Sequence, residues 1–85
     1  GVPGASVTLV RDAGGRPVGL SLHGVSALAS YGVRDGDVLV TANGMSLRTA
    51  DEALRALGAV SRANTVTVQL LRGGAPVFIT VDLVP

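Results

Sequence analysis

The sequence predicts an α+β fold, a small and partly open β-barrel or sandwich of five to six mostly antiparallel strands with one short and one longer helix. Short runs of alternating apolar and polar residues are separated by turns rich in glycine and aspartate. One such run leads directly into an Asn-Gly pair, Asn43-Gly44. A threonine three residues before a glutamate then opens an apolar pattern with helical spacing. The length is that of one domain, and we expect residues 1–85 to form it.

The first two predicted strands form a hairpin. Residues 6–10 and residues 18–22 each alternate in part, and residues 11–17 between them hold two glycines, an aspartate and a proline. Glycine and aspartate at this spacing favour a hairpin loop. We therefore expect the two strands to be antiparallel.

The middle of the chain predicts a short helix followed by a central strand. Residues 27–29 form an apolar helical turn that Gly32 ends, and residues 34–37 lead into a strand over residues 38–42. This strand is apolar almost throughout, as expected of a strand that is buried on both faces. Asn43-Gly44 tolerates positive φ and so closes a tight turn after the strand.

A capped amphipathic helix is predicted over residues 50–60. Thr49 lies three residues before Glu52, the spacing at which a hydroxyl and a carboxylate reciprocally satisfy free amides at a helix start. Acids in the first turn and Arg62 just beyond the end suit the helix dipole. One apolar face is expected, formed by residues at three- and four-residue spacing: Ala53, Leu54, Leu57 and Val60.

A second hairpin closes the predicted fold. Residues 65–71 alternate cleanly, residues 72–75 form the turn, and residues 76–83 return as the last strand. One face of this strand is expected to carry its alternate apolar residues, Val77, Ile79, Val81 and Leu83.

Composition restricts both the core and the function. Hydrophobic residues make up 47% of the chain but Tyr31 and Phe78 are the only aromatic ones, so the core must be packed from valine, leucine and alanine. The formal net charge is +1 and the arginines are scattered, which gives no reason to expect binding to nucleic acid or to an anionic membrane. Without cysteine, disulfides and thiolate chemistry are excluded.

No apolar stretch reaches the roughly 20 residues of a membrane-spanning helix. Because the chain starts at Gly1 without methionine, we expect a soluble fragment or processed piece of a larger protein.

Candidate catalytic residues are few. His23 is the only histidine, with Ser21 and Ser26 close in sequence, and nucleophilic catalysis would need a serine and an orienting carboxylate that converge on the ring. A histidine at a strand end or on the surface is the simpler interpretation. Asp35 and Asp37 lie in a glycine-containing turn, where aspartates commonly accept hydrogen bonds from local amides. We therefore expect no enzymatic activity.

Metal and cofactor sites are not expected either. One histidine without cysteine leaves too few ligands for a zinc site. Gly14-Gly15 and Gly73-Gly74 lack the strand-to-helix setting and the Lys-Ser/Thr pair of a phosphate-binding loop, so hairpin turns account for them better.

The order of these signals resembles the PDZ domain over residues 26–83. The residues at family positions are Leu28, Gly32, Gly36-Asp37-Val38-Leu39, Asn43-Gly44, Ala53 and Leu57. The resemblance implies a peptide-binding module, in which an extended partner segment adds to the exposed edge of the second strand beside the main helix. The implied groove would be lined by Val18, Gly19, Leu20, Ser21 and Leu22 on the strand and by Ala50 and Leu54 on the helix. The alternative is that the leucines among them fill the core.

Two departures from the family pattern affect this groove. Many PDZ domains hold a peptide carboxylate in a Gly-Leu-Gly-Phe-like loop before the second strand, where this chain has Pro17, which lacks an amide proton. Many also begin the helix with a histidine that reads a hydroxyl group, and here that position is Ala50. The resemblance therefore implies that the wall formed by Ala50 and Leu54 prefers an apolar side chain.

At finer detail, residues 11–22, 28–44, 47–53 and 72–77 look like the PDZ domain of the C component of bacterial type II secretion. This implies a periplasmic domain of an inner-membrane-anchored protein that recognises exported proteins or docks on the secretin, without itself contacting the membrane or nucleic acid. PDZ domains of HtrA-type serine proteases and of site-2 proteases share much of the pattern, so a regulatory or substrate-sensing domain of such a protease is the alternative. A third possibility is a spacer or dimer contact whose groove is filled by its own side chains, which would fit the scarcity of aromatic residues.

Overall fold

The computed structural model describes residues 6–24 and 30–82, which form one antiparallel sheet and one α-helix. In chain order the elements are β1 (Ser6–Arg11), β2 (Pro17–His23), β3 (Val38–Ala42), β4 (Met45–Ser46), α1 (Ala50–Val60), β5 (Thr65–Arg72) and β6 (Ala75–Asp82). The predicted α+β class is confirmed, with six strands. The short helix predicted at residues 27–29 lies outside the described residues.

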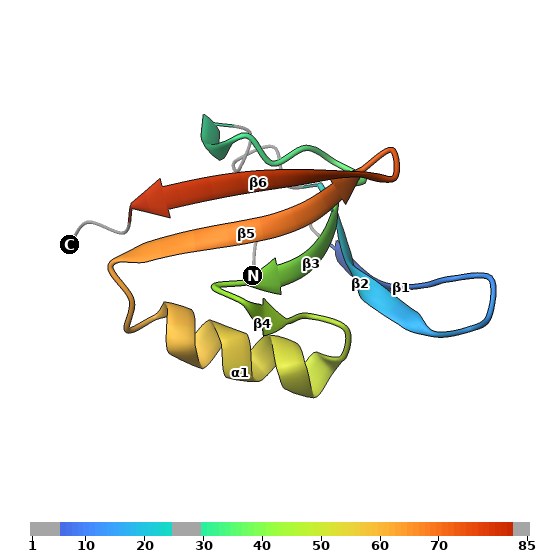
Figure 1. Ribbon diagram of the computed structural model, residues 1–85, viewed down its shortest axis with the longest axis horizontal. Helices are drawn as coiled ribbons and strands as arrows, with labels where there is room; N and C mark the ends of the chain where they lie inside the picture. Colours follow the sequence, from blue (N-terminus) through green and yellow to red (C-terminus); the bar gives the residue numbers. More distant parts are fainter. Residues whose placement is uncertain (1–5, 25–29, 83–85) are drawn as a thin grey trace.

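The sheet has the order β1-β2-β3-β5-β6, with β4 paired to the end of β3. Within the described residues, β1 and β6 are therefore the two ends of the sheet (Figure 1). Strand β2 pairs with β1 along its length and with β3 at Leu20 and Ser21. The prediction of an exposed β2 edge is therefore wrong, because two strands of the same chain occupy both of its sides.

Close packing of β2 against β3 depends on Gly19. A Cβ atom at this position would overlap the main-chain carbonyl oxygen of Leu39. Because a side chain cannot occupy the space of a backbone atom, only glycine lets β3 approach at this point. Gly19 thus has a structural reason for its place in β2.

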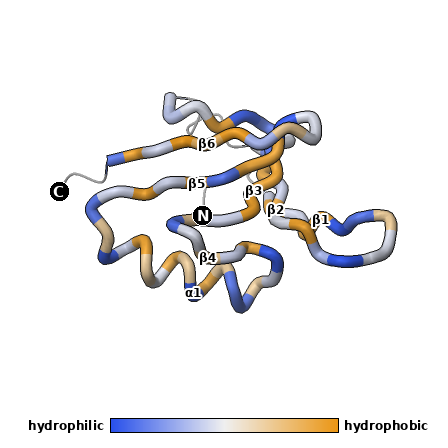
Figure 2. The backbone as a smooth tube through the Cα atoms, viewed as in Figure 1, coloured by the Kyte–Doolittle hydropathy of each residue, from blue (hydrophilic) through white to orange (hydrophobic). Residues whose placement is uncertain are grey.

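The predicted first hairpin is confirmed, and its loop is held by one aspartate. Asp12 Oδ1 accepts hydrogen bonds from the backbone N–H groups of Gly14 and Arg16, at 2.9 and 3.0 Å. This side-chain bonding to nearby amides is the usual reason for aspartate in turns. The loop projects from the rest of the molecule (Figure 1) and is largely hydrophilic (Figure 2).

The Asn43-Gly44 turn has the predicted geometry and a further role. The φ angles are +49° at Asn43 and +80° at Gly44, and the turn joins β3 to β4, a two-residue strand that the sequence did not predict. The Asn43 side chain donates to the Thr65 carbonyl at 3.0 Å and accepts from the Thr67 N–H at 2.8 Å. One residue therefore both makes the turn and fixes the start of β5.

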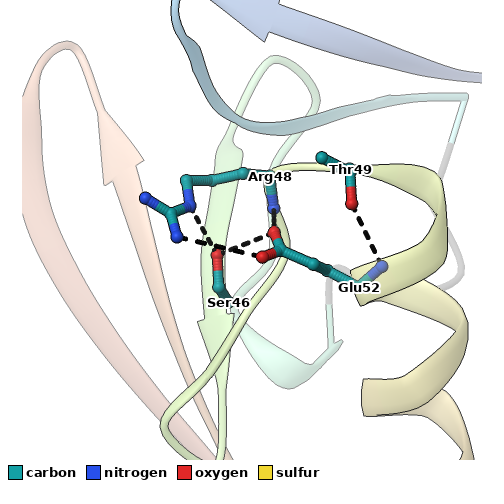
Figure 3. Close-up of polar contacts among 4 residues, drawn as sticks. All are labelled: Ser46, Arg48, Thr49 and Glu52. Atoms are coloured by element: carbon teal, nitrogen blue, oxygen red, sulfur yellow. Dashed lines mark hydrogen bonds and ion pairs between the residues drawn. The ribbon is translucent and has the colours of Figure 1, made fainter.

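Helix α1 begins at Ala50, as predicted, and Thr49 is its N-cap (Figure 3). The Thr49 hydroxyl accepts from the Glu52 N–H at 3.1 Å. The Glu52 carboxylate in turn accepts from the Arg48 N–H and from the Ser46 hydroxyl, both at 3.0 Å. The carboxylate therefore joins the helix start to β4 and the connecting turn.

The face that α1 turns to the sheet is made of small residues. Ala56 is 1% exposed, and Ala53 and Val60 pack against the core residues Ala42 and Leu47. The predicted apolar face is therefore only partly correct, since Leu54 and Leu57 are 68% and 63% exposed. Small side chains on the inner face therefore contact the core, while the two leucines are largely exposed.

On β6 the predicted alternation is confirmed within the described residues. Val77, Ile79 and Val81 are half-buried, while Pro76, Phe78 and Thr80 between them are exposed. This alternation places one face of β6 toward the interior and the other toward solvent. Leu83, predicted for the same inner face, lies outside the described residues.

Candidate functional site

An apolar cavity of about 750 Å³ lies between α1 and the sheet. Residues of α1 and of four strands line it, together with the turns before β3 and before α1. They are Leu22, Tyr31, Val33, Leu39, Ala42, Leu47, Ala53, Ala56, Leu57, Val60, Val66, Val68, Val81 and Asp82. Nearly all are aliphatic, so the cavity offers hydrophobic contact and few hydrogen-bonding groups.

The helix wall of this cavity is formed by other residues than the sequence suggested. Leu57 lines the cavity although 63% of it is exposed, so it lies at the opening to solvent, as does Tyr31, which is 53% exposed. Ala50 and Leu54, predicted for the groove, are exposed and do not line it. That these two residues contact a partner stays a prediction. Of the predicted strand residues, Leu22 alone lines the cavity.

In the described residues β1 and β6 are the two edge strands, and the edge next to the predicted strand β2 is that of β1. In the described part of the chain, β1 pairs only with β2, so its other edge has no strand beside it. Val7 lies opposite Leu22 and Leu9 opposite Leu20, and residues opposite each other in an antiparallel pair share a face. Val7 and Leu9, 61% and 36% exposed, therefore extend the apolar face that includes the cavity.

The charge on the described lining of the cavity is negative. Among the described residues that line it, Asp82 is the only charged one. Asp82 is exposed at the end of β6, where Oδ1 accepts a weak hydrogen bond from the Thr65 hydroxyl at 3.3 Å. The last turn of α1 contains no basic residue.

An ion pair that the sequence analysis missed holds the turn next to the cavity. The Asp37 carboxylate, in a residue 2% exposed, accepts from Arg72 Nε at 3.0 Å and from Nη2 at 2.8 Å. Arg72 Nη2 also donates to the Gly32 carbonyl at 2.8 Å. These bonds fix residues 32–37, and with them Val33 in the cavity wall, to the end of β5.

The environment of Asp37 favours its charged form. The hydrogen bonds from Arg72 lower the pKa of Asp37 below its ordinary value of 3.8, with further help from the Arg34 N–H and against the effect of burial. Sequence analysis placed Asp37 in a turn that bonds local amides, which the Arg34 contact confirms. The long-range partner, 35 residues away, leaves no local pattern to read.

The serine and histidine considered for catalysis do lie together. Ser21 Oγ and His23 Nε2 are 3.1 Å apart on one face of β2. Ser21 is only 7% exposed, so its hydroxyl is not presented to a substrate. A nucleophile must reach the reacting carbon, so this contact is better explained as satisfying a buried hydroxyl.

In residues 6–24 and 30–82, no helix combines the length and the apolar character that crossing a bilayer requires. Over the same residues, histidine and carboxylate side chains nowhere gather in threes as metal ligands would.

Comparison with known proteins gives matches among solved structures only, since no family model and no curated protein matches the chain. The PDZ domain of the pullulanase C protein of the type II secretion system from Klebsiella pneumoniae, crystallised in complex with a fatty acid, is 22% identical with a TM-score of 0.70. That match covers 93% of this chain and 84% of the other.

Two structures of the PDZ domain of EpsC from Vibrio cholerae are each 16% identical and also match 93% of this chain. The longer has a TM-score of 0.73 with 77% of its length covered, and the shorter 0.67 with 93% covered. At these identities the likeness is one of fold. The chain has the PDZ fold, and that fold resembles the PDZ domains of type II secretion C proteins.

Proposed function

We propose that the chain is a non-catalytic protein-interaction module that binds an extended segment of another protein. The observation that carries this proposal is that, in residues 6–24 and 30–82, no strand pairs with the outer edge of β1, which lies on the same apolar face as the cavity. An extended segment added to this edge gains main-chain hydrogen bonds, while every second side chain points to the cavity face. The groove of the proposal therefore lies at β1 and Leu57, one strand away from the position that the sequence suggested.

Two leucines of α1 provide a matched test. Leu57 and Leu54 are both exposed and both lie on the helix, but only Leu57 lines the cavity. Segments of exported proteins and of the secretin are titrated into isotope-labelled protein, and backbone resonances are followed by NMR. The resonances of Val7, Leu22 and Leu57 are expected to shift. Leu57→Lys is expected to weaken binding about tenfold, the loss of one buried leucine contact, while Leu54→Lys has little effect.

The opposite result would support the groove that was predicted from the sequence. If Leu54→Lys weakens binding and Leu57→Lys does not, the partner contacts the Ala50 and Leu54 wall instead of the cavity. If millimolar segments of exported proteins or of the secretin shift no backbone resonance of β1, the proposed interaction role is wrong. Both variants change exposed residues, so their thermal unfolding should match that of the parent chain and serves as the folding control.

For its cellular setting, we propose a periplasmic domain of an inner-membrane-anchored component of type II secretion, acting in recognition of exported proteins or in secretin docking. The resemblance in fold to the pullulanase C protein and EpsC domains supports this setting. A photo-crosslinking residue at Val7 of the full-length protein, expressed in its own cells, should capture an exported protein or the secretin. The same residue at Phe78, exposed on β6 at the other end of the sheet, is the control. An upstream trypsin-like domain in the full-length sequence would instead favour the regulatory domain of a protease.

A second candidate ligand is an acyl chain. The pullulanase C domain was crystallised with a fatty acid, and the cavity of this chain is large and lined mainly by aliphatic side chains. A compound with a dodecyl chain is then expected to bind, to shift backbone resonances in a way that depends on Leu57, and to compete with the protein segment for the cavity. Shifts spread evenly over the surface, independent of Leu57, would exclude this candidate.

A further inference from the structure

The charges around the cavity indicate which kind of protein segment it accepts. On the basis of the proposed function, we infer that the cavity binds an internal segment of its partner, with aliphatic side chains, and disfavours a free C-terminal carboxylate because Asp82 lines it. A chain terminus and an internal segment have the same side chains and backbone, so the difference lies only in the charge that is brought to the cavity.

The first observation is the carboxylate of Asp82. It is the only charged group among the described lining residues, and it is exposed at the end of β6. A second carboxylate brought close to it would face a like charge, and the described lining residues include no cation to offset it. A neutral peptide bond at the same place carries no such penalty.

The second observation is the direction of α1. Leu57 and Val60, from its last turn, line the cavity together with Ala53 and Ala56, so the C-terminal end of the helix is one part of the cavity wall. A helix C-terminus carries a partial negative charge. Here the last carbonyls accept hydrogen bonds from the residues that follow, but no basic residue lies in the last turn. Arg62 follows the helix but is exposed and is not part of the lining.

The third observation is the register of the edge strand, which decides which end of a bound segment arrives there. A segment that runs antiparallel to β1 brings its C-terminal end to the Ser6 end of that strand. Ser6 and Val7 pair with His23 and Leu22, and Leu22 lines the cavity together with Asp82. His23 bonds Ser21 on the opposite face of β2, away from Leu22. The C-terminal end of the segment therefore arrives at the side of the cavity that Leu22 lines, and Asp82 belongs to the lining of the same cavity.

Three forms of one peptide test the inference on the complete chain. The peptide alternates threonine and leucine and ends in leucine, and it is made with a free carboxylate, with a C-terminal amide, and with a Gly-Ser-Gly extension that ends in a free carboxylate. The extension moves the charge about 10 Å further along without changing the net charge. We expect the amide and the extended form to bind about two- to five-fold more tightly than the first form at low salt, a difference that added salt reduces.

Two variants assign the effect to its source. Asp82→Asn should bring the three dissociation constants together, whereas Asp51→Asn, which removes one exposed charge from the first turn of α1, should leave the difference intact. If the form with the free carboxylate at leucine binds as tightly as the amide or more tightly, the inference is wrong while the interaction role stands. If no form binds and the segments of exported proteins also fail, the proposed function is wrong and the inference with it.

Discussion

Single residues of this small domain do several structural tasks at once, and Asn43 is the clearest case. It supplies a positive φ angle for the β3–β4 turn, and its side chain makes two hydrogen bonds to the backbone of β5. The Asn43 N–H also donates to the Thr67 carbonyl at 2.8 Å. Turn geometry and sheet assembly therefore depend on the same side chain and the same backbone conformation.

Substitution of Asn43 should separate these two tasks. Asn43→Gly keeps the positive φ angle and loses the side-chain bonds, so it should lower the free energy of unfolding by about 1–2 kcal/mol. Asn43→Ala also places a Cβ in the left-handed region and should lose about 1 kcal/mol more. Chemical denaturation measures both. Equal losses for the two variants would show that the φ angle contributes nothing.

Substitution of Gly19 tests the close packing of β2 against β3. Gly19→Ala would place a methyl group on the Leu39 carbonyl oxygen, so β3 must move away from β2. We expect a loss of about 3 kcal/mol or more in the free energy of unfolding, at the upper end of overpacking effects. Gly58→Ala is the control, since nothing lies within 4 Å of a Cβ atom there, and in the last turn of α1 it should stabilise the chain by up to about 0.5–1 kcal/mol. Similar unfolding curves for Gly19→Ala and the parent would contradict the close approach of the strands.

At the scale of elements, the start of α1 is fixed by Thr49 and Glu52. Thr49→Ala removes the oxygen that accepts the Glu52 N–H and should lower the free energy of unfolding by about 1 kcal/mol. Thr49→Ser, which keeps the hydroxyl, is the matched control and should stay near the parent value. Thermal unfolding followed by circular dichroism distinguishes the variants. If serine and alanine destabilise equally, the hydroxyl is not the source of the effect.

The elements also show what the sequence could predict. The strands of both hairpins, the Asn-Gly turn and the Thr49 cap come from local patterns, in which a few neighbouring residues decide the backbone. Strand β4, with two residues, is too short for alternation to be visible. Leu54 and Leu57 have the spacing of core residues, yet it is Ala53 and Ala56 that pack with the core, a choice that depends on how α1 is rotated about its axis and not on the spacing alone.

The site was harder to predict than the elements. The sequence pattern indicates that β2 is a strand, but whether its edge is free depends on which strands pair with it. In the described residues β1 and β3 occupy both sides of β2, so the free edge on this side of the sheet is that of β1. Leu22 was predicted and lines the cavity, whereas Val7, Leu57 and Asp82 were not predicted for the site, because their proximity arises from pairing between distant segments.

At the scale of the whole molecule, two carboxylates tie distant parts together. Asp37 joins the turn before β3 to the end of β5 through Arg72, and Glu52 joins α1 to β4 through Ser46. The Ser46 hydroxyl bond lowers the pKa of Glu52 below its ordinary value of 4.5, and the Arg72 bonds lower the pKa of Asp37 below 3.8. Both groups therefore release protons more readily in the folded chain than in the unfolded chain.

This difference predicts how stability depends on pH. A carboxylate with a depressed folded pKa contributes stability that is complete above its unfolded pKa, and this stability is lost as the pH falls through the folded value. The unfolded chain then binds more protons than the folded one, so the free energy of unfolding should be level with respect to these groups above about pH 5 and decline below about pH 4.5. The steepest part should lie below pH 3.8, where Asp37 titrates.

Removing the Asp37 charge should remove most of that slope and much of the stability. Asp37→Asn leaves the partly exposed Arg72 guanidinium without its carboxylate, so the free energy of unfolding should fall. The variant should therefore unfold at a lower temperature at neutral pH, while the gap to the parent narrows as the pH falls toward 3. Asp51→Asn, in the exposed first turn of α1, serves as the control for the loss of one negative charge. A gap that stays constant between pH 7 and pH 3 would show that ionised Asp37 does not hold the turn, because a protonated carboxyl group would then serve Arg72 equally well.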